Sequence, residues 1–160
     1  MGRPKVRAAA TSVYHRAVTQ LPDRNVQLRD ATDEDIPALL SLWKDENVTA
    51  SLTDSPAAVR LAIATATAVL VAVDDGAVIG CLIATFDGWR GNMYRLAVRP
   101  PHRRRGIASA LVLEGERRLR AAGARRITAL IESDHDWAVS FWERAGYELD
   151  RRMGRWAKML

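Results

Sequence analysis

Apolar residues along this chain occur in two patterns, as short runs of strand length and at helical intervals. Together these patterns predict an alternation of strands and helices. Apolar runs of strand length occupy residues 25–31, 69–73, 77–86, 92–98 and 126–131. Apolar positions recur at helical intervals in residues 36–43, the stretch from Pro56, residues 107–122 and residues 137–145. Tyr147 to Leu160 predicts a final hairpin. The expected order is β-α-α-β-β-β-α-β-α-β, which makes this an α/β (α+β) chain.

Capping residues mark the boundaries of the predicted helices. Thr32 and Asp35 are spaced as a capping box, and Ser55-Pro56 begins a second helix, with residues 44–53 as the loop between the two. Gly123 predicts the end of the third helix. The packed positions are expected to be Ile36, Leu39, Leu40 and Trp43 in the first helix, Ile107, Leu111, Val112, Leu119 and Ala122 in the third, and Trp137, Ala138, Phe141 and Ala145 in the last.

Turn residues and glycines predict how the strands and helices meet. Asp74-Asp75-Gly76 indicates a tight antiparallel hairpin, and residues 87–91 indicate a second turn. Gly80 inside a strand indicates a bulge or the close approach of another backbone. Gly115 costs its helix about 1 kcal/mol relative to Ala, so we expect it where the helix packs closely on the sheet.

Composition limits the classes of protein to which this chain can belong. The chain has 160 residues, of which 48% are hydrophobic and 27% charged, as in an ordinary globular domain. Residues 1–24 hold five basic groups and one acid, so we expect a flexible basic N-terminal extension ahead of one folded domain over 25–160. Cys81 is the one cysteine, which excludes an intramolecular disulfide and predicts a buried, inert thiol. With no zinc-ligand spacing, membrane-length apolar stretch or signal-peptide pattern, we expect a cytoplasmic protein without a metal or a membrane partner.

The stretch from Leu96 to Ala108 is the most informative for function. A strand ends at Pro100-Pro101, three arginines lead to Gly106, and a helix begins there. The first turn of a helix presents unpaired N–H groups and a partial positive charge, and Gly106 allows a ligand to approach the backbone closely. This order of elements predicts an anion-binding site. A solvated charge run at Arg103 to Arg105 is the alternative.

Within that stretch, Val98-Arg-Pro-Pro-His-Arg103-Arg-Arg-Gly106-Ile-Ala108 resembles the acetyl-CoA signature of the GCN5-related N-acetyltransferases (GNAT). Arg103, Gly106 and Ala108 fill its fixed positions. The resemblance implies that family's fold, a mixed, mostly antiparallel sheet with helices on both faces, and acetyl-CoA as the cofactor. It makes residues 25–160 the acetyltransferase domain.

The resemblance also implies which groups hold the cofactor. The strand would splay from its neighbour and offer backbone groups to pantetheine at Leu96, Ala97 and Val98, and a backbone N–H there would stabilise an oxyanion. The pyrophosphate would be held by the backbone and charge of a loop comprising Arg103, Arg104, Arg105, Gly106, Ile107 and Ala108.

A second motif, His135 to Tyr147, resembles the family's Asn-x-x-Ala-x-x-Phe-Tyr-x-x-x-Gly-Phe run and departs from it twice. His135 stands where many members have an Asn that contacts the cofactor, and an imidazole keeps the capacity to hydrogen-bond. A solvent-facing histidine is the alternative. Trp142 stands at the catalytic position of a Tyr that protonates the leaving thiolate. An indole N–H is no useful acid near neutral pH, so packing is our first interpretation of Trp142.

The catalytic base and the acceptor are less defined. Asn92 stands where some members have a Glu, which leaves Tyr94 and Glu132 as candidates for orienting or deprotonating the amine. Positioning an amine beside a thioester supplies much of the rate, and the resemblance implies direct transfer to a primary amine. The acceptor, a small molecule or a protein, is expected near Trp43, Asn47 and Trp89.

Two other function classes stand beside N-acetyl transfer. The absent Tyr and Glu would suit a non-catalytic acyl-CoA-binding module. The net charge of +5 would suit a nucleic-acid-binding protein, but no aromatic RNA-binding motif or basic zipper accompanies it. We therefore expect an amine substrate and no nucleic acid as partners, with a homodimer as one assembly to test.

Overall fold

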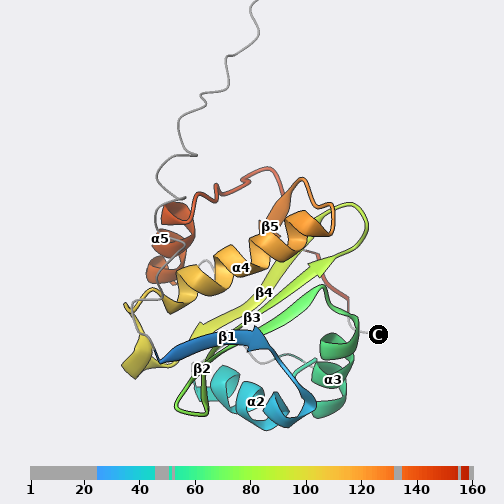
Figure 1. Ribbon diagram of the computed structural model, residues 1–160. Helices are drawn as coiled ribbons and strands as arrows, with labels where there is room; N and C mark the ends of the chain where they lie inside the picture. The colour runs from blue at the N-terminus through green and yellow to red at the C-terminus, as the bar shows by residue number, and fades with distance from the viewer. Residues whose placement is uncertain (1–24, 46–50, 52, 132–134, 155, 159–160) are drawn as a thin grey trace, which may run out of the picture. The chain divides into compact units, whose positions relative to one another are not determined.

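The computed structural model describes residues 25–45, 51, 53–131, 135–154 and 156–158. Two compact units divide the chain, one ending at Ala129 and the other beginning at Leu130. The first unit contains β1 (Val26–Asp30), α2 (Ile36–Asp45), α3 (Pro56–Thr65), β2 (Ala68–Asp74), β3 (Ala77–Phe86), β4 (Gly91–Val98), α4 (Ile107–Ala121) and β5 (Ile127–Ala129), with 3-10 turns η1 (Asp33–Asp35) and η2 (Pro100–His102) (Figure 1). The second contains α5 (Asp136–Arg144). The predicted extension over 1–24 lies outside the described residues.

The five strands form one sheet in the order β1-β2-β3-β4-β5. Neighbours from β1 to β4 are antiparallel, and β5 runs parallel to β4. Asp75 and Gly76 have φ of 48° and 78°, the backbone of the tight hairpin that the sequence predicts. The predicted mixed, mostly antiparallel sheet is therefore confirmed.

Helices cover both faces of this sheet, as Figure 1 shows for α4 on one side and for α2 and α3 on the other. A Cβ at Gly115 would lie 2.8 Å from Leu82 Cδ2 and 3.1 Å from Met93 Cε, which confirms the predicted close packing of α4. Buried side chains on the opposite face include Leu39, Leu42, Trp43, Val59, Val69, Val71 and Cys81. Gly80 also meets its prediction, since its Cβ would lie 3.1 Å from the Ala97 carbonyl oxygen.

The first helix begins with the predicted capping box. Thr32 N–H donates to Asp35 Oδ2 at 2.8 Å, and Arg29 bonds the same carboxylate at 2.6 Å. The Arg29 hydrogen bond holds the pKa of buried Asp35 below its ordinary value. This cluster fixes the chain where it passes from β1 into α2.

Some helix details differ from the prediction. α2 continues through Asp45, so the start of the predicted loop is helical, and residues 46–50 and 52 lie outside the described part. Leu42 is fully buried and Leu40 only partly, because Leu42 shares the sheet-facing side with Leu39. The prediction for Ala122 is wrong: α4 ends one residue earlier, and Ala122 is exposed.

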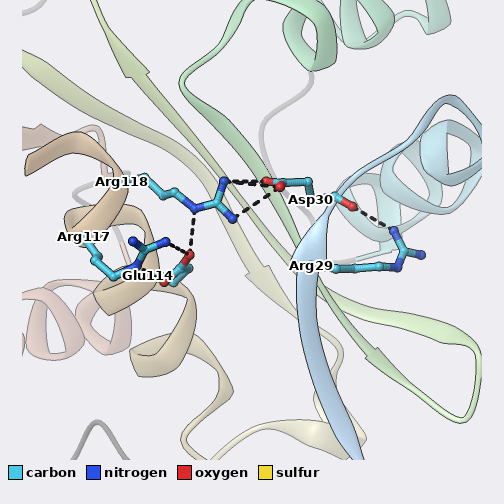
Figure 2. Close-up of polar contacts among 5 residues, drawn as sticks. All are labelled: Arg29, Asp30, Glu114, Arg117 and Arg118. Carbon is cyan, nitrogen blue, oxygen red and sulfur yellow. Dashed lines mark hydrogen bonds and ion pairs between the residues drawn. The ribbon is translucent and has the colours of Figure 1, made fainter. Parts of the chain in front are cut away.

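Ion pairs join α4 to β1 (Figure 2). Arg118 donates to Glu114 at 2.7 Å on its own helix and to Asp30 at 3.0 Å in β1. Arg117 donates to the other Glu114 oxygen at 2.7 Å. Hydrogen bonds from Arg117 and Arg118 lower the pKa of Glu114 to about 2.

In the second unit, the predicted packed stripe of α5 is wrong at Trp137, which is 64% exposed. Trp142 is buried instead and meets Phe141 and Tyr147 edge to face, with ring centroids 5.5 and 4.7 Å apart. Tyr147 N–H donates to the Trp142 carbonyl at 3.0 Å, so the chain turns back after the helix and covers Trp142. The Tyr147 ring thus lies on the side of α5 that carries Trp142.

The predicted final hairpin is also wrong for the residues that the structure describes. Residues 147–154 and 156–158 contain no strand. Met153 N–H donates to the Asp150 carbonyl at 3.2 Å and closes a turn. Across the described chain, every helix is too short or too polar to cross a membrane.

Candidate active site

β5 is shorter than β4, so β4 has β5 as a neighbour only along its first part. The two strands pair only between Gly91–Met93 and 127–129. Residues 94–98 of β4 continue beside β3 alone. The edge of β4 at Leu96 and Val98 therefore has no strand partner among the described residues, and the splay that the resemblance implies stays a prediction.

A bulge interrupts β4 just beyond the part that pairs with β5. Tyr94 pairs with Ile83 and Ala97 with Cys81, so β4 has one residue more than β3 between these pairs. Arg95 lies in the bulge and has a φ of 57°. This left-handed conformation is unfavourable for any residue that has a Cβ atom. The bulge re-aims the residues that follow it in the strand.

Buried side chains hold the bulge in place. The Arg95 guanidinium pairs with Asp54 at 2.5 Å, with 15% and 19% of the two side chains exposed, and lies 5.2 Å from the Trp43 ring centroid. Cys81 Sγ–H donates to the Arg95 carbonyl at 3.2 Å and accepts from Trp43 Nε1–H at 3.2 Å. Sequence reasoning missed Arg95 and Asp54, since a contact between residues 41 positions apart leaves no local pattern.

Burial makes Cys81 unsuitable as a nucleophile. The residue is fully buried, and desolvation raises the pKa of its thiol to about 12. The thiol is therefore protonated at neutral pH. This confirms the prediction of a buried thiol and removes the one cysteine from covalent chemistry.

The free edge of β4 presents the backbone of Val98. Arg99 N–H donates to the Ile79 carbonyl at 2.8 Å, which ties that residue to β3. The neighbouring Val98 carbonyl faces the other way and accepts from Arg103 Nε at 3.0 Å. Because the N–H and C=O of one strand residue share an edge, Val98 N–H also faces the edge that β5 does not reach.

The loop after β4 leads into the N-terminus of α4. Arg104 and Gly106 both have left-handed backbones, with φ of 60° and 77°. The first helical hydrogen bond runs from Ala110 N–H to the Gly106 carbonyl at 3.0 Å. The N–H groups of residues 107–109 precede it and have no acceptor within the helix. This geometry fits a diphosphate, which prefers backbone donors and positive charge.

The three arginines of the loop have different surroundings. Arg105 lies 2.8 Å from His102 Nδ1 and 3.4 Å from Asp74 Oδ2, and thereby braces the loop against the β2–β3 hairpin. Arg103 is bonded to the Val98 carbonyl, and the side chain of Arg104 is exposed. The sequence did not indicate Asp74 or His102 as supports of this loop.

The remaining predicted site residues that the structure describes in the first unit lie at different places along β4 and α2. Glu132 and Asn47 lie outside the described residues. Trp43 is 3% exposed beside the bulge, whereas Trp89 is 72% exposed in the turn before β4, toward the opposite end of that strand. Tyr94 is half-buried and pairs with Ile83, which packs on the α2–α3 side of the sheet.

In the second unit, His135 is the N-cap residue of α5 and stacks on Trp137 with ring centroids 5.7 Å apart. Trp142 is 6% exposed and packed between aromatic rings. This buried position between aromatic rings agrees with a packing role for Trp142.

Known proteins resemble this chain in sequence and in fold. Residues 28–147 match the model of the Acetyltransferase (GNAT) family. Acetyltransferase SG1711 of Sodalis glossinidius (strain morsitans) is 40% identical over 80 residues, which are 50% of this chain and 56% of that relative. The chain thus matches little more than half the length of this relative.

Solved structures share the fold at low identity. PaiA N-acetyltransferase from Thermoplasma acidophilum, in complex with coenzyme A, has a TM-score of 0.69 and 18% identity over 78% of this chain and 91% of its own. AAC(6')-Iy, in complex with the bisubstrate analogue CoA-S-monomethyl-acetylneamine, has a TM-score of 0.70 and 18% identity over 84% and 99%. The sequence match across most of the elements described above leads to one conclusion: the chain belongs to the GNAT family of acetyltransferases.

Proposed function

We propose that this protein transfers an acetyl group from acetyl-CoA directly to a primary amine. The observation that carries the proposal is the junction of β4, the loop and α4, where a free strand edge leads into a left-handed glycine and a helix N-terminus. The complexes of the two structural relatives with coenzyme A and with a bisubstrate analogue support this cofactor and an amine acceptor.

In the proposed complex, the chain holds acetyl-CoA through backbone groups. The N–H of Val98, and that of Leu96 near the bulge, bind pantetheine along the free edge of β4. The N–H groups of residues 106–108 bind the pyrophosphate, and Arg103 and Arg104 add positive charge. Arg105 keeps the loop in place through Asp74.

Acetyl-CoA would supply an acetyl thioester, whose carbon–sulfur bond breaks as the amine nitrogen bonds the acetyl carbon. The amine loses one proton, and CoA leaves as the thiolate. The N–H of Val98 is the proposed donor to the developing oxyanion. Tyr94 orients the amine, and Glu132 accepts its proton through water. Trp142 has only a packing role in this scheme, and Cys81 takes no part because its thiol is protonated and buried.

Gly106→Glu tests the proposal. The new carboxylate occupies the phosphate position and repels it, so we expect calorimetric titration to detect no CoA binding and the turnover of acetyl-CoA with an amine panel to disappear. Gly88→Glu is the matched control, because Gly88 has φ of 89° and nothing lies within 4 Å of its Cβ position. It adds the same charge and similar backbone strain at a turn near the far end of β4.

Two outcomes contradict the proposal. Unchanged CoA affinity in a folded Gly106→Glu variant would remove the loop from cofactor binding. CoA binding by the wild-type protein without turnover on any amine would instead favour a non-catalytic acyl-CoA-binding module. Circular dichroism melting curves of both variants establish that they are folded.

A further inference from the structure

A second pocket lies at the end of β4 that is remote from the cofactor loop. It has a volume of about 380 Å³ and is lined by Gly88, Trp89, Arg90, Gly123, Arg125 and Arg126. Gly91 begins β4 beside this pocket and Val98 ends the strand at the loop, a separation of about 23 Å at strand spacing. The volume falls in the range of about 300–1,000 Å³ that is usual for small-molecule sites.

Hydrogen bonds determine the shape of the pocket walls. Asp87 Oδ1 accepts from Arg90 N–H at 2.7 Å and from Trp89 N–H at 2.8 Å, which lowers the pKa of Asp87. Gly91 N–H donates to the Arg126 carbonyl at 2.9 Å and so ties the turn before β4 to the connection that precedes β5. The walls are therefore organised before any ligand binds.

Arginines are prominent among the residues that line the pocket. Three of the six lining residues are arginines and none is acidic. The nearby Asp87 carboxylate is engaged with backbone N–H groups of its own turn. A guanidinium presents a planar fork of donors that matches phosphate oxygens, and several of them favour a dianion over a single carboxylate.

Trp89 adds a flat apolar surface to these charges. It is 72% exposed, and the Arg90 guanidinium carbon lies 4.0 Å from the ring centroid, which steadies the indole by a cation–π contact. Exposed aromatic rings beside cationic groups are typical platforms for nucleobases. Trp89 is the one aromatic residue among those that line the pocket, whereas a nucleic-acid strand needs a series of platforms.

We propose that this pocket binds a free mononucleotide, with the base on Trp89 and the phosphate against Arg125. The ligand class follows from the combination of a single stacking surface, clustered guanidiniums and room for one small molecule. The site is separate from the acetyl-CoA loop and does not depend on the proposed acetyl transfer.

Calorimetric titration of the full chain with 5′-AMP at low ionic strength tests the inference. We expect one AMP to bind per chain. Adenosine, which lacks the phosphate, and inorganic phosphate, which lacks the base, should each bind at least about tenfold more weakly. Arg125→Ala should weaken AMP about tenfold, and so should Trp89→Leu. Both residues are exposed, so both variants should fold.

Two control variants locate the binding. Arg117→Ala removes a charge from an exposed residue of α4 that does not line the pocket, and should leave AMP affinity unchanged. Gly106→Glu blocks the proposed cofactor loop and should also leave AMP affinity unchanged.

Four results would overturn the inference. The first is the absence of AMP binding at millimolar concentration. The second is an equal loss of affinity in Arg117→Ala, which would indicate diffuse attraction by the net charge. The third is loss of AMP binding in Gly106→Glu, which would place the nucleotide in the cofactor loop. The fourth is a single-stranded oligonucleotide that binds more tightly than AMP and loses its affinity in Trp89→Leu, which would indicate a nucleic-acid surface.

Discussion

Arg95 places an unfavourable backbone conformation just beyond the part of β4 that pairs with β5. A left-handed conformation at a residue with a side chain costs about 1–3 kcal/mol. Asp54 offsets that cost by pairing with the guanidinium, and Cys81 does so by donating to the Arg95 carbonyl. Because both contacts act on the same residue, the bulge is held from its side chain and from its backbone.

Cys81 yields a prediction at the residue scale. Its thiol has a pKa of about 12 and is fully buried, so native protein should not react with a disulfide reagent such as DTNB at pH 8. Protein unfolded in guanidinium should react completely. Cys81→Ala should lower the free energy of unfolding by about 1–2 kcal/mol through its lost hydrogen bonds, while activity per folded molecule persists. Loss of activity in a folded Cys81→Ala protein would contradict this.

At the scale of elements, α4 has three functions along its length. Its N-terminus provides the backbone donors of the candidate cofactor loop. Its middle approaches the sheet at Gly115, where a larger residue would overlap Leu82. Its second half is fastened to β1 by Arg118 (Figure 2). A helix held at two points along the sheet keeps its first turn in a fixed position.

The ion pairs of Glu114 predict a dependence of stability on pH. Its pKa is lowered in the folded protein from 4.5 to about 2, so the folded state binds fewer protons than the unfolded state between these values. The stabilisation is complete above about pH 4.5 and is lost as the pH falls toward 2. Glu114→Gln should therefore destabilise the protein by about 1 kcal/mol at pH 7 and not at pH 2.

Urea unfolding at both pH values measures the effect of Glu114→Gln. Asp33→Asn is the control, because its ion pair with Arg60 joins two side chains that are more than half exposed, where solvent screens the charges and only a smaller effect is expected. A difference between wild type and Glu114→Gln that persists unchanged at pH 2 would rule out the ionised pair as its cause.

At the scale of the whole molecule, positive charge gathers at both ends of β4. The candidate cofactor loop carries Arg103–Arg105, and the second pocket carries Arg90, Arg125 and Arg126. With a net charge of +5, the protein attracts anions over distances of about a Debye length, so CoA association should slow as salt increases.

Removal of residues 1–20 is expected to leave CoA affinity unchanged. Their composition offers little apolar surface to bury, and the supports of the cofactor loop identified above, Asp74, Val98 and His102, belong to the first unit's strands and turns. Calorimetry on the shortened and complete chains gives the comparison. A large loss of affinity would show that the N-terminal segment contributes to the cofactor site.

Features that depend on short-range physics could be predicted from the amino-acid sequence. Strand and helix segments follow from the period of the apolar residues, and the hairpin at Asp75-Gly76 and the capping box at Thr32 follow from local backbone and hydrogen-bond preferences. The loop at Gly106 belongs with them, since a strand, a positive-φ glycine and a helix start are consecutive in the chain. These signals need no knowledge of distant residues.

Contacts between residues far apart in the sequence, and the burial of particular side chains, could be established only from the tertiary structure. The sheet order brings Asp54 to Arg95 across 41 positions and Asp74 to Arg105 across 31, and no periodicity encodes such pairs. Trp142, against which Tyr147 packs, is buried, whereas Trp137 is exposed, although both fit an amphipathic pattern. Local preferences specify which elements form, whereas burial and the pairing of charges depend on which elements the fold brings together.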